Sequence, residues 1–219
     1  FKYLQLFNIK KNISLRILHV TNFNERHDGR LFFNTGRRIN NGLIRLGHSI
    51  LEFSDRDIQK YYKNYKDLSG AKTLNEKLKK TCYNFKPDLI VMGHADLISA
   101  DALGELKDDY PKLKFAQWFL DHLNPNGPDF LRNKSRVLDK IELIDGNFLS
   151  TSPDVVKFLP KKTKNFFIPN PADSSFETLS NYSHDCNMDV FFALSHGVHR
   201  GILKSGKFDD RAIFLKKLI

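Results

Sequence analysis

Cysteine is scarce in this sequence, and no apolar run is long enough to cross a membrane. Its 219 residues include two cysteines, Cys82 and Cys186, which lie far apart and outside any spacing typical of metal ligands. This excludes a disulfide-dense scaffold, and we interpret both residues as reduced thiols of a cytoplasmic protein. A membrane helix needs about 20 consecutive apolar residues. The N-terminus also lacks the apolar core of a signal peptide.

Acidic residues are fewer than basic ones, 25 against 35, which gives a formal net charge of +10. Such a charge is typical of proteins that bind nucleic acid, membrane headgroups or phosphorylated substrates, but a Lys-, Asn- and Phe-rich composition also explains it. No basic and aromatic motif of a nucleic-acid-binding module appears, so we expect no nucleic-acid partner. Peripheral contact with the inner face of a membrane through Arg37, Arg38 and Arg45 stays open.

The sequence does contain a regular alternation of apolar runs and amphipathic segments. Strand-like runs occur at residues 15–21, 49–53, 88–93, 113–119, 146–151 and 165–169. Helical patterns occur at residues 31–47, 72–85, 100–109 and 129–144, and a short helix is expected after Ser152. This alternation predicts an α/β fold, a doubly wound parallel sheet of the Rossmann-like kind, over residues 15–170.

We expect four regions along the chain. They are an N-terminal lead-in (1–14), the Rossmann-like domain (15–170), a linker (171–187) and the start of a truncated second α/β domain (188–219). The last region is too short to bury a core of its own. Because residue 1 is Phe, we also expect the chain to begin inside a longer reading frame.

The first predicted helix, residues 31–47, has an apolar stripe and a polar face. We expect the stripe in the core; its members are Phe32, Gly36, Ile39, Leu43 and Leu46. We expect the other face in solvent; its members are Arg37, Arg38, Asn40, Asn41 and Arg45. Gly47 is well placed to end the helix in a left-handed cap.

Polar and titratable residues gather after four of the predicted strands. The carboxyl ends of parallel strands meet at one edge of a sheet, where ligands of such folds bind. We therefore predict one ligand site from four loops, with these residues: Asn24, His27, Asp28, Gly29 and Arg30; Gly93, His94, Ala95 and Asp96; Asp121 and His122; and Ser150, Thr151 and Ser152.

His94 and Asp121 are the candidate catalytic residues of this site. His94 can act as a general base or donate a hydrogen bond to a substrate hydroxyl; alternatively it only caps the end of its strand. Asp121 and His122 can position an acceptor or its base; alternatively they form a turn before the loop at 124–128. His27, Asp96 and His122 are candidate substrate-binding residues.

Only one glycine, Gly29, lies in the first loop, where a dinucleotide fingerprint needs three. The usual NAD site is therefore not expected. Gly29 and Arg30 can instead present backbone amides and a guanidinium to a phosphate, or form a plain turn with a solvated arginine. His94, Asp121 and His122 have no tight metal-ligand spacing, so we expect no metal site.

The order of these motifs resembles the N-terminal domain of a GT-B glycosyltransferase, in particular the CgeB-like and family-four-like glycosyltransferases. The resemblance covers nearly the whole chain. It is carried by residues 17–53 (ILHVTNFNERHDGR onward), 87–96 (PDLIVMGHAD), 117–125 (QWFLDHLNP), 166–177 (FFIPNPADSSFE) and 188–206 (MDVFFALSHGVHRGILKSG).

This resemblance implies an enzyme of surface polysaccharide or glycan synthesis that transfers a hexosyl group from a nucleotide sugar to a hydroxyl acceptor. His94 matches a histidine near the transferred sugar, and Gly29 and Arg30 match a loop that faces the donor phosphates. The loop entering the donor domain is matched by His199, Arg200 and Gly201. No cofactor is implied beyond the donor, because GT-B enzymes usually stabilise the leaving diphosphate without a metal.

The sequence departs from the family pattern at one point. The acidic donor-binding motif of such transferases lies downstream of the last residue here, so we expect mainly the acceptor half, inactive on its own. Two other hypotheses stay open. One is a non-catalytic α/β module that binds a nucleotide or glycan, and the other is a nucleic-acid binder driven by charge, which predicts steep salt dependence.

Overall fold

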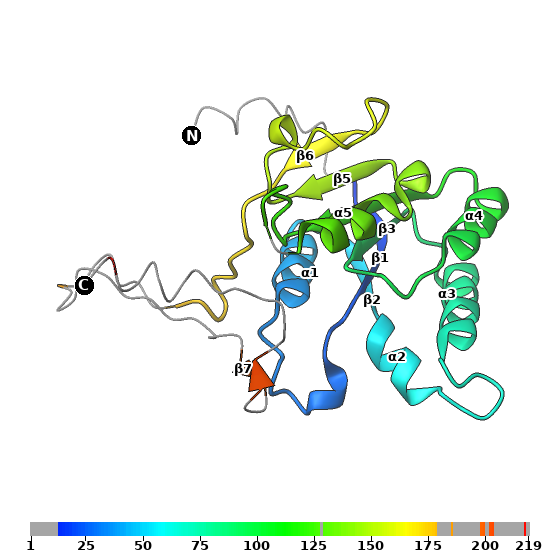
Figure 1. The fold of residues 1–219 in the computed structure, drawn as a ribbon. Helices are drawn as coiled ribbons and strands as arrows, with labels where there is room; N and C mark the ends of the chain where they lie inside the picture. The colour runs from blue at the N-terminus through cyan, green and yellow to red at the C-terminus, as the bar shows by residue number, and fades with distance from the viewer. Residues whose placement is uncertain are drawn as a thin grey trace.

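The computed structural model describes residues 13–127 and 129–178, together with residues 185, 198–199, 202–203 and 217. A sheet of six parallel strands in the order β2-β1-β3-β4-β5-β6 forms its centre (Figure 1). The strands are β1 (Arg16–Thr21), β2 (Ser49–Ser54), β3 (Leu89–Gly93), β4 (Lys114–Phe119), β5 (Gly146–Leu149) and β6 (Asn165–Phe167). The predicted α/β fold with a parallel sheet is confirmed.

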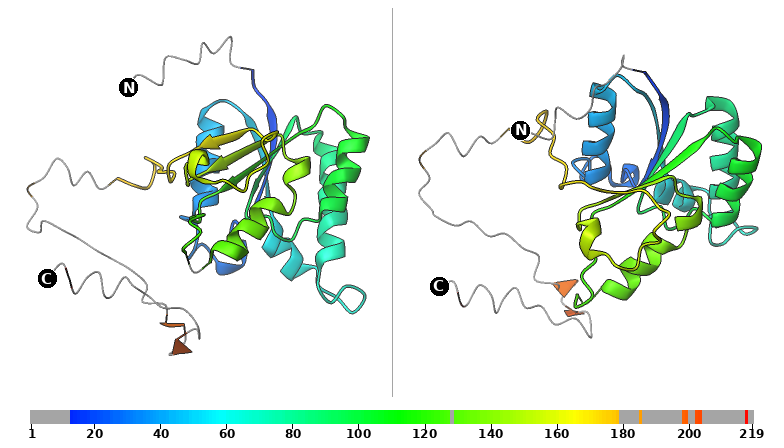
Figure 2. Two further views of the ribbon diagram at one scale, coloured as in Figure 1. Left: turned by 45° about the horizontal axis from the view of Figure 1, so that its top comes forward. Right: turned by 90° about the horizontal axis from the view of Figure 1, so that it is seen from above.

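Helices lie on both faces of the sheet (Figure 2). One face carries α1 (Thr35–Arg45), and the other carries α3 (Ala71–Phe85), α4 (Ala100–Asp109) and α5 (Phe130–Leu138). The short helix α2 (Asp55–Tyr61) follows β2 directly and contacts β1, β2 and α3. The described 3-10 turns of this domain are η2 (Glu25–His27), η3 (Ile141–Leu143) and η4 (Pro153–Val155).

Alternating strand residues build a core on each face. Toward α3 and α4 the buried residues include Leu18, Val20, Ile90, Met92 and Phe115. Toward α1 they include Ile17, Val91, Ala116 and Trp118. Because apolar residues occupy both faces of the central strands, these strands read as continuous apolar runs in the sequence.

The chain goes from β1 to β2 on one side and later enters β3 on the other side of β1. The loops after β1 and β3 therefore diverge at this switch point and leave a crevice at the carboxyl edge of the sheet. The Gly36 backbone of α1 comes so close to β1 that a Cβ there would lie 2.6 Å from Thr21 Cγ2.

The first helix begins at Thr35, not at the predicted Leu31. Asn34 sets this start, because its side-chain oxygen accepts a hydrogen bond from the Arg37 amide at 3.0 Å. Phe32 therefore lies in the preceding loop with 42% of its surface exposed, so its predicted place in the core is wrong.

The two faces of α1 also differ from the prediction. Leu46 is 63% exposed at the end of the helix, so it does not belong to the core stripe. Asn40, expected in solvent, is fully buried and bonds to His19 and Glu52 on neighbouring strands. Polar partners on other strands thus reverse the expected burial of Asn40. The predicted left-handed Gly47 is confirmed, with φ +86°.

The helix predicted over residues 129–144 is shorter than expected. It ends at Leu138, after which the chain forms η3 and becomes extended at Ile144. The helix predicted after Ser152 is only the 3-10 turn η4, and Ser152 makes no side-chain capping bond. Pro153 begins this turn, but Pro160 would interrupt a helix, and the segment between the two prolines is short.

The helices α3 and α4 follow the prediction closely. On α3, Leu74, Leu78 and the free thiol Cys82 are buried on one side. On α4, the hydroxyl of Ser99 accepts a hydrogen bond from the Ala102 amide at 3.1 Å and caps the helix as expected.

Residues 171–178, here called the α1 strap, lie along α1 within the segment predicted to be a linker. The Asp173 carboxylate accepts hydrogen bonds from Arg45 Nη2 and Asn41 Nδ2, both at 2.7 Å. Farther along, Glu177 pairs with Arg38 at 2.7 Å. Beyond the strap, Val198–His199 (β7) pairs antiparallel with Ile202–Leu203 (β8). Apart from these four residues and residue 217, the predicted second domain lies outside the described residues.

Candidate functional site

A cavity of about 220 Å³, here called the His94 cavity, opens at the carboxyl edge of the sheet beside the switch point. The residues that line it come from β3, β4, the loop after β3, and α5 and its C-terminal end. They are Met92, His94, Ala95, Asp96, Gln117, Trp118, Phe119, Ser135, Arg136, Asp139 and Lys140. The cavity therefore includes one of the four predicted loops, the one after β3, together with the ends of β3 and β4 and residues of α5 and its C-terminal end.

His94 occupies a constrained position in this cavity. Its backbone has φ +48°, a left-handed conformation uncommon for residues other than glycine. Its ring stacks on Phe119 with centroids 4.6 Å apart and meets Trp118 edge-on at 5.7 Å. Strained backbone of this kind gathers at functional sites, where the surrounding structure holds it in place.

Asp121 approaches the same imidazole, as the sequence predicted for neighbouring strand ends. Its Oδ2 atom lies 3.9 Å from His94 Nδ1, which is close for an ion pair but too long for a hydrogen bond. Burial lowers the pKa of His94, and Asp121 acts against this shift. The lowered pKa favours the neutral imidazole, which has a nitrogen lone pair for a substrate hydroxyl.

Asp96 lies between two arginines that the sequence did not single out. Its Oδ2 atom is 2.9 Å from Arg136 Nη2 and 3.3 Å from Arg56 Nη2. Arg56 is in the first turn of α2 and Arg136 is on α5. The two arginines lie far apart in the sequence and form no motif. They approach Asp96 only because the fold places α2 and α5 beside the loop after β3.

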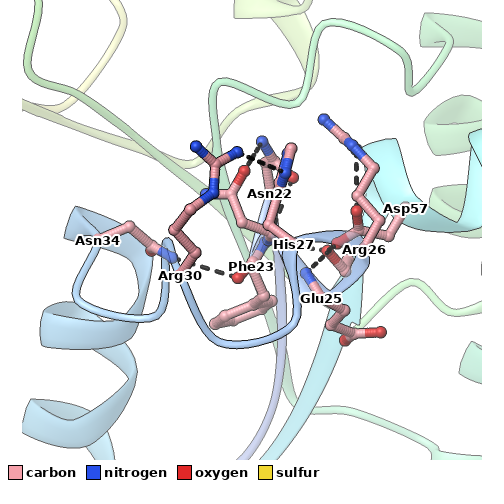
Figure 3. Close-up of polar contacts among 10 residues, drawn as sticks. Asn22, Phe23, Glu25, Arg26, His27, Arg30, Asn34 and Asp57 are labelled. Atoms are coloured by element: carbon pink, nitrogen blue, oxygen red, sulfur yellow. Dashed lines mark hydrogen bonds and ion pairs between the residues drawn. The ribbon is translucent and has the colours of Figure 1, made fainter.

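Hydrogen bonds to Asp57 and from Asn34 fix the loop after β1 (Figure 3). Its Glu25 amide and Arg26 Nη1 both donate to the buried Asp57 carboxylate of α2 at 2.8 Å. Asn34 Nδ2 donates to the Phe23 carbonyl at 3.2 Å. These bonds hold the ends of the loop against the crevice.

The tip of this loop carries the predicted phosphate-binding residues Gly29 and Arg30 and the predicted substrate-binding residue His27. His27 Nδ1 and Arg30 Nη2 are 3.4 Å apart, and Gly29 has φ +81° with open space beside it. A phosphate could reach these groups from solvent. Among the described contacts, none joins them to His94, so the structure does not bring His27, Gly29 and Arg30 into the His94 cavity.

His122 and the residues after β5 hold neighbouring loops in place. His122 Nδ1 accepts a hydrogen bond from the Asn124 amide at 3.2 Å, which is the turn interpretation left open above. The Thr151 hydroxyl oxygen accepts from the Leu123 amide at 3.0 Å, and the Ser150 hydroxyl donates to the Leu120 carbonyl at 2.9 Å. These groups position the loop that carries Asp121.

Three predicted residues belong to the C-terminal region. His199 lies in β7, opposite Ile202, while Arg200 and Gly201 lie outside the described residues. In the described part of the chain, no group of three or more His, Cys, Asp or Glu side chains could hold a metal ion. No helix within the same residues combines the length and apolar character needed to cross a membrane.

No protein-family model matches this chain, and the search of curated proteins found no significant match.

Proposed function

We propose that this protein is a GT-B-type glycosyltransferase that moves a hexosyl group from a nucleotide sugar to a hydroxyl acceptor. The described domain supplies the acceptor side of the reaction. The observation that carries the proposal is the position of the His94 imidazole at the carboxyl edge, with the Asp121 carboxylate 3.9 Å away and a cavity in front of it. Burial lowers the pKa of His94, which favours the neutral form that a general base needs. The order of the sequence motifs is the second support.

His94 is the general base in this proposal. It accepts a hydrogen bond from the acceptor hydroxyl and takes its proton as the new glycosidic bond forms. Asp121 stabilises the imidazolium that results, and the contact is expected to shorten when substrate binds, as hydrogen bonds in unliganded active sites often do. Glycosyl transfer needs such a base because a sugar hydroxyl is a weak nucleophile at neutral pH.

The donor is proposed to bind with its phosphates toward the tip of the loop after β1, near Gly29 and Arg30. A second domain would hold the nucleotide, with His199, Arg200 and Gly201 at its entrance. Beyond the donor itself, the proposal requires no cofactor. Surface polysaccharide or glycan synthesis at the inner face of the membrane is the proposed setting.

A panel of nucleotide sugars tests this function. The protein at its full natural length is mixed with UDP-, GDP-, ADP- and CMP-sugars, and its melting temperature and the release of nucleotide are measured. We expect the sugars of one nucleotide to raise the melting temperature of the protein and to release that nucleotide when a glycan acceptor is present. If no sugar nucleotide gives a shift or turnover, the alternative of a non-catalytic nucleotide- or glycan-binding module replaces the proposal.

A further inference from the structure

A second cavity, of about 540 Å³, lies beside the His94 cavity and is here called the arginine cavity. Its lining residues are Arg26, Arg56, Gln59, Lys60, Asp96, Leu97 and Arg136. Asp96 and Arg136 line both cavities, so the two are adjacent. The two cavities therefore meet at the Asp96–Arg136 ion pair.

The lining of the arginine cavity is strongly basic. It contains four cations and the single carboxylate of Asp96. Asp57 neutralises Arg26 from outside the lining. Even with both carboxylates counted, the cavity keeps an excess of positive charge, which favours an anionic ligand.

The two central arginines are held in place and still have donors free. Arg56 and Arg136 each approach the same Asp96 oxygen through the Nη2 atom. A guanidinium has five N–H donors, so the described contacts with Asp96 leave most of them for a ligand. Arginine pairs planar oxyanions such as phosphate and carboxylate through two parallel hydrogen bonds.

The basic residues come from separate parts of the fold. Arg26 lies in the η2 turn, Arg56 and Lys60 on α2, and Arg136 on α5. Asp57 is fully buried and fixes Arg26 at 2.8 Å. Folding therefore gathers these cations around one cavity, which distinguishes them from basic residues spread over a solvent-exposed helix face.

We propose that the arginine cavity binds an oxyanion, a phosphate or carboxylate carried by the acceptor, while the acceptor hydroxyl faces His94. This assignment to the acceptor rests on the proposed function; the anion site itself does not. The protein thus selects negatively charged acceptors over neutral ones. A lipid-linked acceptor would supply a phosphate, and an acidic sugar would supply a carboxylate. Both groups are oxyanions that arginine can bind.

An NMR titration of the full-length protein tests the site without turnover. Trp118 is the only tryptophan and lines the His94 cavity, so its single indole N–H signal reports on this region, together with the amides of Asp96 and Leu97. Inorganic phosphate, glucuronate and neutral glucose are added at constant ionic strength. Phosphate tests the phosphate source, glucuronate the acidic sugar, and glucose is the uncharged control.

We expect phosphate or glucuronate to shift these signals and glucose to leave them unchanged. R56Q and R136Q should each weaken anion binding by about tenfold, the loss of one charge-assisted contact. R132Q is the matched control, because Arg132 lies on α5 four residues before Arg136 and its side chain is 56% exposed. R56K keeps the positive charge at this position, so it should bind the anion more tightly than R56Q does.

No shift with either anion, or equal weakening in R132Q, overturns the proposal. The nucleotide-sugar panel fails or succeeds independently of this titration. Anion binding without nucleotide-sugar turnover would reject the transferase function and leave the site in place. Turnover without anion binding would reject the site alone.

Discussion

The indole Nε1 of Trp118 donates a hydrogen bond to Nε2 of His19, at 3.3 Å. An indole nitrogen can only donate, so His19 must accept at Nε2 and carry its proton at Nδ1. Nδ1 in turn lies 3.1 Å from the Asn40 side-chain oxygen. The wall of the His94 cavity is therefore linked through a buried histidine to α1.

His19 makes stability dependent on pH. Burial lowers its pKa from 6.5 to about 4, so between these values the unfolded chain binds a proton that the native protein does not. The free energy of unfolding is therefore highest above pH 6.5, and it falls by up to about 3 kcal/mol as the pH drops to 4. The difference in unfolding free energy between wild type and H19Q, measured by urea denaturation, should change by this amount. A difference independent of pH would contradict the account.

Asp55 and Asp57 are both fully buried but should respond oppositely to neutralisation. Neither Asp55 oxygen has a well-formed hydrogen bond among the described residues, and burial raises its pKa from 3.8 to about 7. Between about pH 4 and pH 7 the unfolded chain has lost the Asp55 proton, while the native protein still holds it. The free energy of unfolding therefore falls as the pH rises through this range. D55N should therefore be more stable than wild type at pH 8, by up to about 4 kcal/mol, and equal to it at pH 4.

D57N is the matched comparison for D55N. The Asp57 carboxylate accepts hydrogen bonds from the Glu25 amide, Arg26 and Ser54. Its neutralisation should cost about 3 kcal/mol, because the charge-assisted bonds to the loop after β1 are weakened. Thermal unfolding at pH 8 should thus move in opposite directions for the two variants.

Gly93 leaves room for the ring of Trp118. A Cβ at this position would lie 1.9 Å from Trp118 Cζ2, so G93A must displace the indole. We expect a loss of about 3 kcal/mol and a changed Trp118 fluorescence spectrum. In G104A the added methyl group meets nothing within 4 Å inside α4, so stability should rise by up to about 1 kcal/mol. Equal effects of the two substitutions would argue against this packing.

The α1 strap depends on Asp173. Hydrogen bonds from Arg45, Ser175 and Asn41 hold the pKa of this carboxyl well below its usual range. D173A should release the strap, because the Arg45 and Asn41 donors lose their acceptor. Limited chymotrypsin digestion should then cut at Phe176 faster than in wild type. S174A, at an exposed neighbouring position, should leave the cleavage rate unchanged.

The strands and the approach of Asp121 to His94 could be predicted from local patterns. Apolar runs mark the strands because both faces of the central sheet are buried, and parallel strand ends meet at one edge. This was enough to predict that His94 and Asp121 lie close together. The helical spacing of apolar residues likewise predicted α3 and its buried side.

The remaining features depend on contacts between distant segments. Asn40 is buried only because His19 and Glu52 supply partners, and no local pattern indicates that. Asp96 was predicted as a site residue, but its arginine partners come from α2 and α5. The arginine cavity therefore needed the three-dimensional arrangement.

Turnover by a His94 variant tests the central claim most directly. In the full-length protein, kcat/KM is measured for the responding nucleotide sugar with wild type, H94A and H48Q. His48 is the control, because it accepts from the Leu15 amide at the opposite end of the sheet. Loss of a general base predicts a drop of about 100-fold or more in H94A with H48Q unchanged. An H94A enzyme as active as wild type would contradict the account.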